Sequence, residues 1–540
     1  MPRSLVSFCL LAGCAAAPVP VAAPPTPPGS PPAPHRAVAP PAYVLLEPAP
    51  DLPRAGQLAV FRPLPADHAQ RAAIEAVLAR PFLRWVLAVG EEAKRRARGR
   101  CGADVACARK LDHPAYFVIA PGGNRPHHGL AIASEGKTVE LADAWYVEID
   151  PAHASILIPH EYGHVLMAES LPDDLPQLPQ TLPHTTGAIT NHVVAFSEGW
   201  GIHFETLAGD RRQEVETYAS WHRDAFAVAG PLAEGDSFVP VTDLFNYAQT
   251  YRRYGCIKDN CFAYLPRPLE SYIHDRTPNA EDVLARWTDT TFDPALVRSL
   301  DQMVASEGVI AALFYRLATA PEPAGPPGAV GDPPLPDPKR YAAFFDAFAH
   351  ITEHRASATP AVLVFLEALI REAAPEERSR IARIAMEVFH HTLVVRDAPR
   401  LYAELHAAGH RVDKPSFKQR LASATPELEA AVQRLAEHPE SLAEVVGPAL
   451  WIENEALRID LPVLGLRQRP LVLDLNAAPI ELLMTIPGVT YREASALDAA
   501  RRSRSFRSLD DLAIQGVRRA TLDKVRAMRA GFEQSHRAPP

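Results

Sequence analysis

The chain lacks four features, each of which would indicate a particular class of protein. It has no run of 18 or more apolar residues, which argues against a helix that crosses a membrane. Its 55 Lys and Arg residues are outnumbered by 64 Asp and Glu residues, so no overall positive charge attracts nucleic acid or anionic membranes. The 6 cysteines form no CxxC motif, and no repeat of solenoid length is evident.

Proline is the residue in excess. The chain has 54 prolines in 540 residues, about twice the average usage. The remaining composition, 47% hydrophobic and 22% charged, is typical of a globular protein. At roughly 150 residues per domain, the length predicts two to four domains with a sizeable core.

The N-terminal residues predict export. Arg3 precedes a short apolar segment, Leu5 to Ala12, and Cys14 follows it directly after Gly13. This pattern resembles a bacterial lipoprotein signal. The resemblance implies that residues 1–13 are a signal peptide and that acylated Cys14 attaches the protein stably to a membrane.

The resemblance also implies a location in the bacterial cell envelope. Ala15 is not an acidic residue of the kind that retains lipoproteins in the inner membrane, which favours the outer membrane. From Pro18 to Pro53 there are 14 prolines in 36 residues. Such a segment cannot form a core, so we expect residues 14–54 to be an extended tether.

The other cysteines lie in two close pairs, Cys101 with Cys107 and Cys256 with Cys261. In an oxidising compartment, an even number of cysteines predicts disulfides, here two short loops. The other two pairings of four cysteines remain open. A four-thiolate zinc site is disfavoured by the spacings.

The body of the chain predicts an α+β fold that is mostly helical. Residues 67–98 have helical spacing, and Pro81 divides them into two helices because proline is tolerated in a first turn. We then expect a small antiparallel or mixed sheet, followed by helices from Asp150 onward. Its strands are predicted at residues 116–119, 129–132 and 138–149.

Composition also predicts the domain organisation. A first folded domain is expected over residues 55–320, and a proline-rich loop over 321–338, with 8 prolines in 18 residues. Residues 339–460 are expected to form a helical region that either completes the first domain or stands separately. A last module spans residues 470–532.

The sequence His160-Glu161-Tyr162-Gly163-His164 is an HExxH motif. Residues i and i+4 share one face of a helix, so the two imidazoles can bind one zinc ion. Glu161 then serves as general base toward a metal-activated water. Pro159 predicts that this helix kinks or begins there.

A zinc site of this kind needs a third protein ligand. A metzincin-like continuation fails, because Met167 and Ser170 stand where glycine and histidine are required. We prefer Glu198, in a later helical stretch, and His184 and His192 remain as alternatives.

Residues 115–210 resemble the gluzincin metallopeptidases. The resemblance implies His160, His164 and Glu198 as ligands of one Zn²⁺ ion and Glu161 as general base. It also implies that residues 55–320 form a metallopeptidase-like zinc domain, whose catalytic lobe residues 339–460 would either complete or adjoin. Two features depart from the family. There are 33 residues between His164 and Glu198, including a proline-rich insertion, and Ile202 replaces the family's frequent acidic residue four positions after the ligand glutamate. Glu205 or His203 could orient a ligand instead. A tyrosine-rich segment, residues 247–274, could supply an oxyanion donor.

Residues 473–529 resemble the tandem helix-hairpin-helix domain of bacterial competence DNA receptors, an all-α module. The two hairpin turns are at Pro487-Gly488 and Gln515-Gly516. Nucleic-acid-binding members hold a phosphate with backbone N–H groups there, usually with a second glycine two positions on. Thr490 and Arg518 occupy those positions in this chain. Residues 471–530 carry 10 basic and 7 acidic residues, so both DNA and a protein partner remain open.

The sequence therefore predicts an exported, lipid-anchored zinc metallopeptidase that hydrolyses peptide bonds in a peptide or protein substrate. The alternative is a non-catalytic envelope scaffold or DNA-uptake accessory that uses the C-terminal module. In that alternative the metal site is structural or vestigial.

Overall fold

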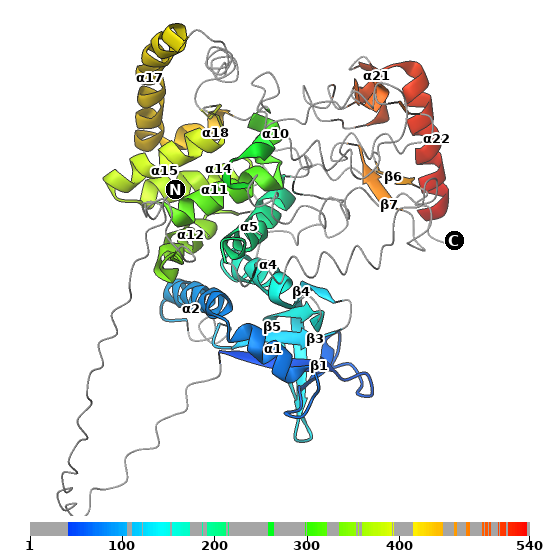
Figure 1. Ribbon diagram of the computed structural model, residues 1–540. Helices are drawn as coiled ribbons and strands as arrows, with labels where there is room; N and C mark the ends of the chain where they lie inside the picture. The colour runs from blue at the N-terminus through cyan, green and yellow to red at the C-terminus, as the bar shows by residue number, and fades with distance from the viewer. Residues whose placement is uncertain are drawn as a thin grey trace, which may run out of the picture. The chain divides into compact units, whose positions relative to one another are not determined.

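The computed structural model describes the chain from Ala42 to His536, with gaps (Figure 1). Residues 1–41 lie outside the described residues, and so do Cys14 and the expected signal peptide. The described residues are 42–104, 111–120, 123–151, 154–172, 186, 192–211, 214, 257–263, 298, 300–320, 334–352, 355, 359–390, 392–393, 414–445, 458–461, 471–475, 489–490, 492–494, 496–497, 500, 506, 508–514 and 517–536.

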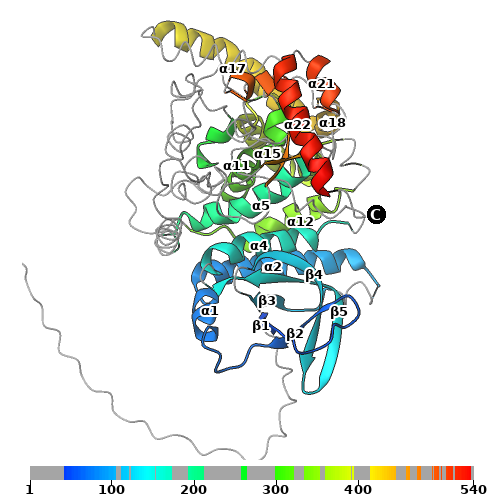
Figure 2. The ribbon, with the colours of Figure 1, turned by 90° about the vertical axis from the view of Figure 1, so that its right-hand side faces the viewer.

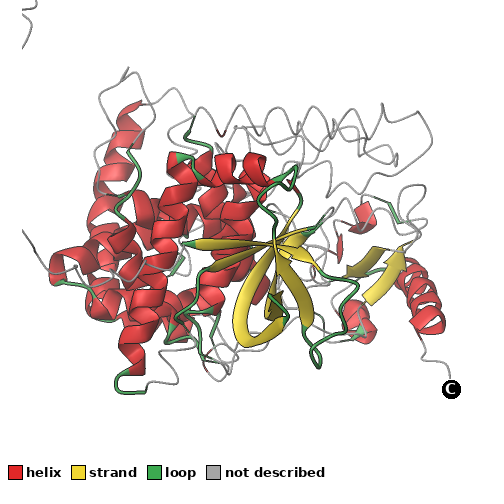
Figure 3. Ribbon diagram, turned by 90° about the horizontal axis from the view of Figure 1, so that it is seen from below, coloured by secondary structure: helices red, strands yellow, loops and turns green. Residues whose placement is uncertain are grey.

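Five strands close into a small mixed barrel in the order β1-β2-β4-β5-β3 (Figure 3). Neighbours β1–β2 and β4–β5 are antiparallel, and the other three pairs are parallel. The strands are β1 Tyr43–Pro48, β2 Ala59–Pro63, β3 Ala115–Ile119, β4 Asn124–Ser134 and β5 Lys137–Ile149.

The mixed sheet and its three predicted strands are observed, but two further strands are present. Strand β1 lies within residues expected to be tether, so the prediction of a tether as far as residue 54 is wrong. The four apolar residues of Tyr43-Val44-Leu45-Leu46 pair with β3, which outweighs the prolines on either side.

Strand β3 and the second half of β5 are largely buried on both faces. Alternate side chains fill the interior of the barrel, including Leu46, Tyr116, Val118, Leu130 and Tyr146. The intervening side chains belong to the main core shared with the helices, including Leu45, Phe117, Ile119, Val147 and Ile149. This alternation is the two-residue period of a strand, applied to a sheet with a core on each side.

Helices α1 (Arg71–Leu78) and α2 (Pro81–Cys101) follow β2, and Pro81 occupies the first turn of α2, as predicted. Helix α4 (Ala154–Ala168) packs across β4 and β5 beside α1 and α2 (Figure 2). Pro159 lies inside α4 rather than at its start.

The helices after α4 extend the same core. A single cluster of buried apolar residues runs from Leu45 to Leu442, so the helices after residue 339 complete the body that carries the barrel. The helices between α4 and the C-terminal part are α5 His192–Ala208, α10 Leu300–Val304, α11 Glu307–Thr319, α12 Tyr341–Phe348, α14 Ala361–Glu372, α15 Pro375–Val388, α17 Lys414–Glu437 and α18 Leu442–Val445. Short 3₁₀ turns occur at η2 Cys261–Ala263, η5 Pro338–Arg340 and η6 Pro439–Ser441.

The C-terminal part begins earlier than expected and is not all-α. Strands β6 (Arg458–Leu461) and β7 (Leu471–Asp474) form an antiparallel pair, and β6 packs against α22 (Arg519–His536). The predicted boundary at residue 470 therefore cuts through a two-stranded sheet. Helix α21 (Leu509–Ile514) is also described, but the hairpin residues Pro487, Gly488, Gln515 and Gly516 lie outside the described residues. None of the described helices combines the length and apolarity needed to cross a bilayer.

The two disulfides expected from the sequence compare differently with the structure. Cys101, at the end of α2, is disulfide-bonded, and its expected partner Cys107 is outside the described residues. Cys261 carries a thiol, so the expected bridge from Cys256 is not formed. Cys256 itself lies outside the described residues.

A buried carboxyl group follows the end of α4. The Glu169 side chain is only 5% exposed, and its Oε1 lies 3.6 Å from Nε2 of His113. Burial raises the pKa of Glu169 to about 7. This value lies above the pKa of about 4.3 that glutamate has in an unfolded chain, so the folded protein binds the proton more tightly. The resulting contribution to the free energy of unfolding is fully present below about pH 4.3 and is lost as the pH rises through 7.

We expect Glu169→Gln to remove this pH dependence. Between pH 6.5 and 8, the free energy of unfolding of the wild-type protein should fall by about 1 kcal/mol more than that of the variant. Burial lowers the pKa of the neighbouring His113, which moves its titration away from that range. Urea denaturation at both pH values measures the difference. Glu140→Gln, at an exposed position of β5 that does not contribute to the shifted pKa of Glu169, is the matched control and should keep the wild-type slope.

Candidate metal centre

Helices α4 and α5 approach each other closely at two glycines. A Cβ atom on Gly163 of α4 would lie 2.9 Å from the Phe204 ring and 3.6 Å from Gly201 Cα of α5. A Cβ on Gly201 would lie 3.0 Å from the imidazole of His160. The Trp200 indole donates a hydrogen bond to the Gly163 carbonyl at 2.7 Å and ties the helices together there. Because Gly163 and Gly201 have no side chains, α5 can approach the histidines of α4.

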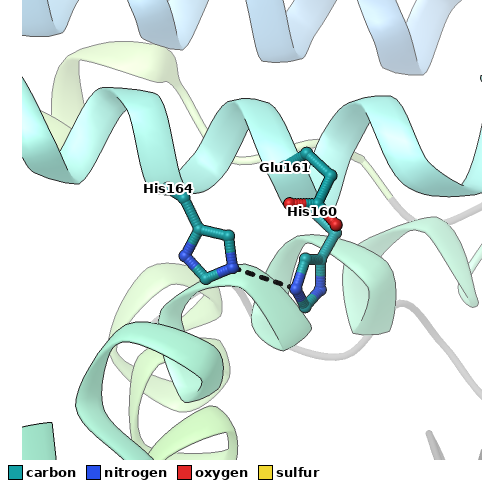
Figure 4. Close-up of side chains that lie close together, drawn as sticks. All are labelled: His160, Glu161 and His164. Atoms are coloured by element: carbon teal, nitrogen blue, oxygen red, sulfur yellow. Dashed lines mark hydrogen bonds between the residues drawn. The ribbon is translucent and has the colours of Figure 1, made fainter. Parts of the chain in front are cut away.

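Both histidines of the motif project from one side of α4 (Figure 4). Their Nε2 atoms are 3.0 Å apart, and the Glu198 Oε2 atom of α5 lies 3.2 Å from Nε2 of His160 and 3.6 Å from that of His164. Three donors bound tetrahedrally to one zinc ion, each ~2.0–2.1 Å from it, would be separated by ~3.3 Å. The observed distances scatter around this value, so these three side chains fit a single zinc ion.

The second nitrogen of each imidazole faces a polar group. His160 Nδ1 is 2.5 Å from Glu205 Oε1, and His164 Nδ1 is 3.0 Å from Ser197 Oγ. A group that accepts the Nδ1 proton leaves the Nε2 lone pair free for a metal, as in most histidine metal sites. Both Nε2 atoms are therefore oriented toward the shared centre.

The centre is nearly buried and negatively charged. The side chains of His160, His164 and Glu198 are 12%, 10% and 18% exposed, so little water screens their charges. Burial lowers the pKa of His160, but Glu205, Glu198 and Glu161 outweigh it and hold that pKa well above its ordinary value. A field that favours a proton on this imidazole also favours a divalent cation beside it.

Glu161 lies with the two histidines in a group whose candidate ligand atoms are within 4.8 Å of one another. Burial raises the pKa of Glu161 above its ordinary value, and the neighbouring imidazoles oppose this rise. A carboxylate with a raised pKa is a better match to a proton transfer near neutral pH. The position and the pKa direction both suit a general base.

The alternative ligands are placed elsewhere or are outside the described residues. His192, at the start of α5, is six residues from Glu198, which is about 240° around the helix. Its Nδ1 accepts a hydrogen bond from the Ala361 N–H at 3.4 Å. Burial lowers its pKa to about 4. His184 and the tyrosine-rich segment between residues 264 and 274 lie outside the described residues, as do residues 247–256.

The sequence offers Glu205 and His203 as groups that could orient a ligand, and the structure distinguishes between them. Glu205 contacts His160, whereas His203 Nε2 shares a hydrogen bond with the Tyr341 hydroxyl at 3.1 Å. Burial lowers the pKa of His203 to about 3, so it is a neutral core residue. The sequence analysis did not single out Ser197. Its position directly before Glu198 was the available signal.

We expect Gly201→Ala to damage the centre without unfolding the protein. The added Cβ would meet the His160 ring at 3.0 Å and displace it, which should weaken zinc binding by about tenfold or more, as judged by competition with a chelator. Gly99→Ala in α2 is the matched control, because nothing lies within 4 Å of its added Cβ. Unchanged zinc affinity in Gly201→Ala would show that His160 does not depend on this close approach.

Comparison with known proteins gives no assignment. No family model matches the chain, and no curated protein or solved structure matches it significantly. Any function must therefore be argued from the geometry of the centre itself.

Proposed function

We propose that this chain is a zinc-dependent metallopeptidase of gluzincin type, exported and held in the cell envelope by a lipid on Cys14. The observation that carries the proposal is the trio of His160, His164 and Glu198, whose donor atoms lie 3.0–3.6 Å apart. The cell-envelope location rests on the sequence of the N-terminus alone.

The proposed reaction is hydrolysis of an amide by water. A bound zinc ion would lower the pKa of a water molecule and polarise the substrate carbonyl. The Glu161 carboxylate accepts a proton from the attacking water as the water oxygen forms a bond to the carbonyl carbon. Glu161 then passes the proton to the leaving nitrogen as the C–N bond breaks.

The other polar residues of the centre act by holding the ligands. The Glu205 carboxylate lies beside Nδ1 of His160, and the Ser197 hydroxyl lies 3.0 Å from Nδ1 of His164. Each contact favours the imidazole tautomer and orientation that a metal needs. Glu205 and Ser197 therefore support zinc binding, and Glu161 alone is assigned the proton transfer.

Glu161→Gln should separate metal binding from catalysis. The amide keeps the size of the side chain but cannot accept the proton, so zinc content should stay at one ion per chain while casein cleavage falls by about 10²–10⁴-fold. The protein to test starts at Ala42, because removal of more residues would delete β1. Activity that survives the substitution would reject Glu161 as the base.

Glu205→Gln should weaken zinc binding by about 10–100-fold, because the His160 ring loses a charged acceptor. Isothermal titration of the metal-free protein with zinc measures the change. Glu140→Gln, at an exposed position of β5, makes the same chemical change away from the centre and should leave the affinity unaltered. Equal affinities in both variants would contradict the orienting role.

A further inference from the structure

The Glu493 carboxylate in the C-terminal part is surrounded by hydrogen-bond donors. Its Oε2 accepts from the Thr490 N–H at 2.9 Å and from the Thr490 hydroxyl at 3.1 Å. Its Oε1 accepts from the Thr521 hydroxyl at 2.7 Å, and the Lys524 ammonium contacts both oxygens at 2.9 and 3.0 Å. One carboxylate therefore satisfies donors from two segments that are about 30 residues apart in the chain.

Half of this arrangement is an ordinary helix start. The Glu493 N–H donates to Thr490 Oγ1 at 3.2 Å, and the Ala494 N–H donates to the Thr490 carbonyl at 2.9 Å. Thr490 and Glu493 thus form a capping box. A capping box explains the bonds with Thr490, but it does not require Thr521 and Lys524, which come from helix α22.

The donors from α22 turn the capping box into an anion site. The Glu493 side chain is only 10% exposed, and Lys524 brings a full positive charge to it. Burial raises the pKa of Glu493, but the hydrogen bonds from Thr490, Thr521 and Lys524 outweigh it and lower that pKa to about 2. The carboxylate is therefore charged at any physiological pH and is bound by the donors that a phosphate oxyanion would use.

We infer that the turn at Val489-Thr490 is an anion site occupied by the chain's own Glu493, and that this turn is closed to nucleic-acid phosphates. The Thr490 N–H stands where the helix-hairpin-helix resemblance would place a phosphate-binding group, and it already donates to a carboxylate. A phosphate approaching the turn would meet the negative charge of Glu493 and would have to compete for Lys524. The inference does not depend on the metal centre.

The experiment uses the full chain and compares wild type with Glu493→Ala, which removes the internal anion. Inorganic phosphate at 20 mM should leave the wild-type melting temperature unchanged and raise that of the variant by about 2 °C or more. Glu493→Ala should also gain salt-dependent binding to a 20-base-pair DNA duplex, measured by fluorescence anisotropy. The double variant with Lys524→Met should lose both gains.

Asp510→Ala controls for the change in net charge, because its side chain is 83% exposed and makes no bond to this site. A phosphate response in Glu493→Ala no larger than in Asp510→Ala would overturn the inference. Wild-type binding to the duplex that Lys524→Met weakens would also overturn it.

If Glu493→Ala fails to fold, the comparison of wild type with Lys524→Met still decides the question. Wild-type binding that is absent, or that is unaffected by Lys524→Met, supports a closed turn. Binding that the Lys524 substitution reduces shows that phosphate reaches the turn.

Discussion

The close approach of α4 and α5 is the constraint on which the candidate centre depends. Two imidazoles one helical turn apart need a third donor from another element, and that donor must reach them within a few ångströms. Gly163 and Gly201 remove the side chains that would hold the helices apart, and Trp200 fixes the crossing by its hydrogen bond to Gly163. Aromatic rings, including those of Phe314 and Phe348, surround Trp200 and bury it completely.

The charge balance at the crossing is consistent with a cation-binding role. Three carboxyl groups, those of Glu161, Glu198 and Glu205, lie around two imidazoles in a nearly buried region. Burying so many acidic groups near one another is costly unless positive charge compensates them. A divalent cation held by two imidazoles and one carboxylate would supply that compensation.

The candidate metal centre and the C-terminal part place charged groups in different ways. The centre between α4 and α5 gathers carboxylates around a position that a cation fits. The C-terminal part instead encloses the single Glu493 carboxylate with donors of its own, which leaves those donors saturated. The first arrangement suits the binding of an external ion, and the second suits the joining of two segments of one module.

Local sequence was sufficient to predict the α+β class, the split of α1 from α2 at Pro81, three of the barrel strands and the pairing of His160 with His164. These features depend on helical and strand periods and on proline geometry, which act over a few residues. Strands β1 and β2, the closure of the barrel, and the strand pair β6–β7 depend on partners far away in the chain. The role of Ser197 and the choice of Glu205 over His203 were decided by the crossing of α4 and α5, because rotation about a helix axis selects which side chains face a neighbour only once that neighbour is in place.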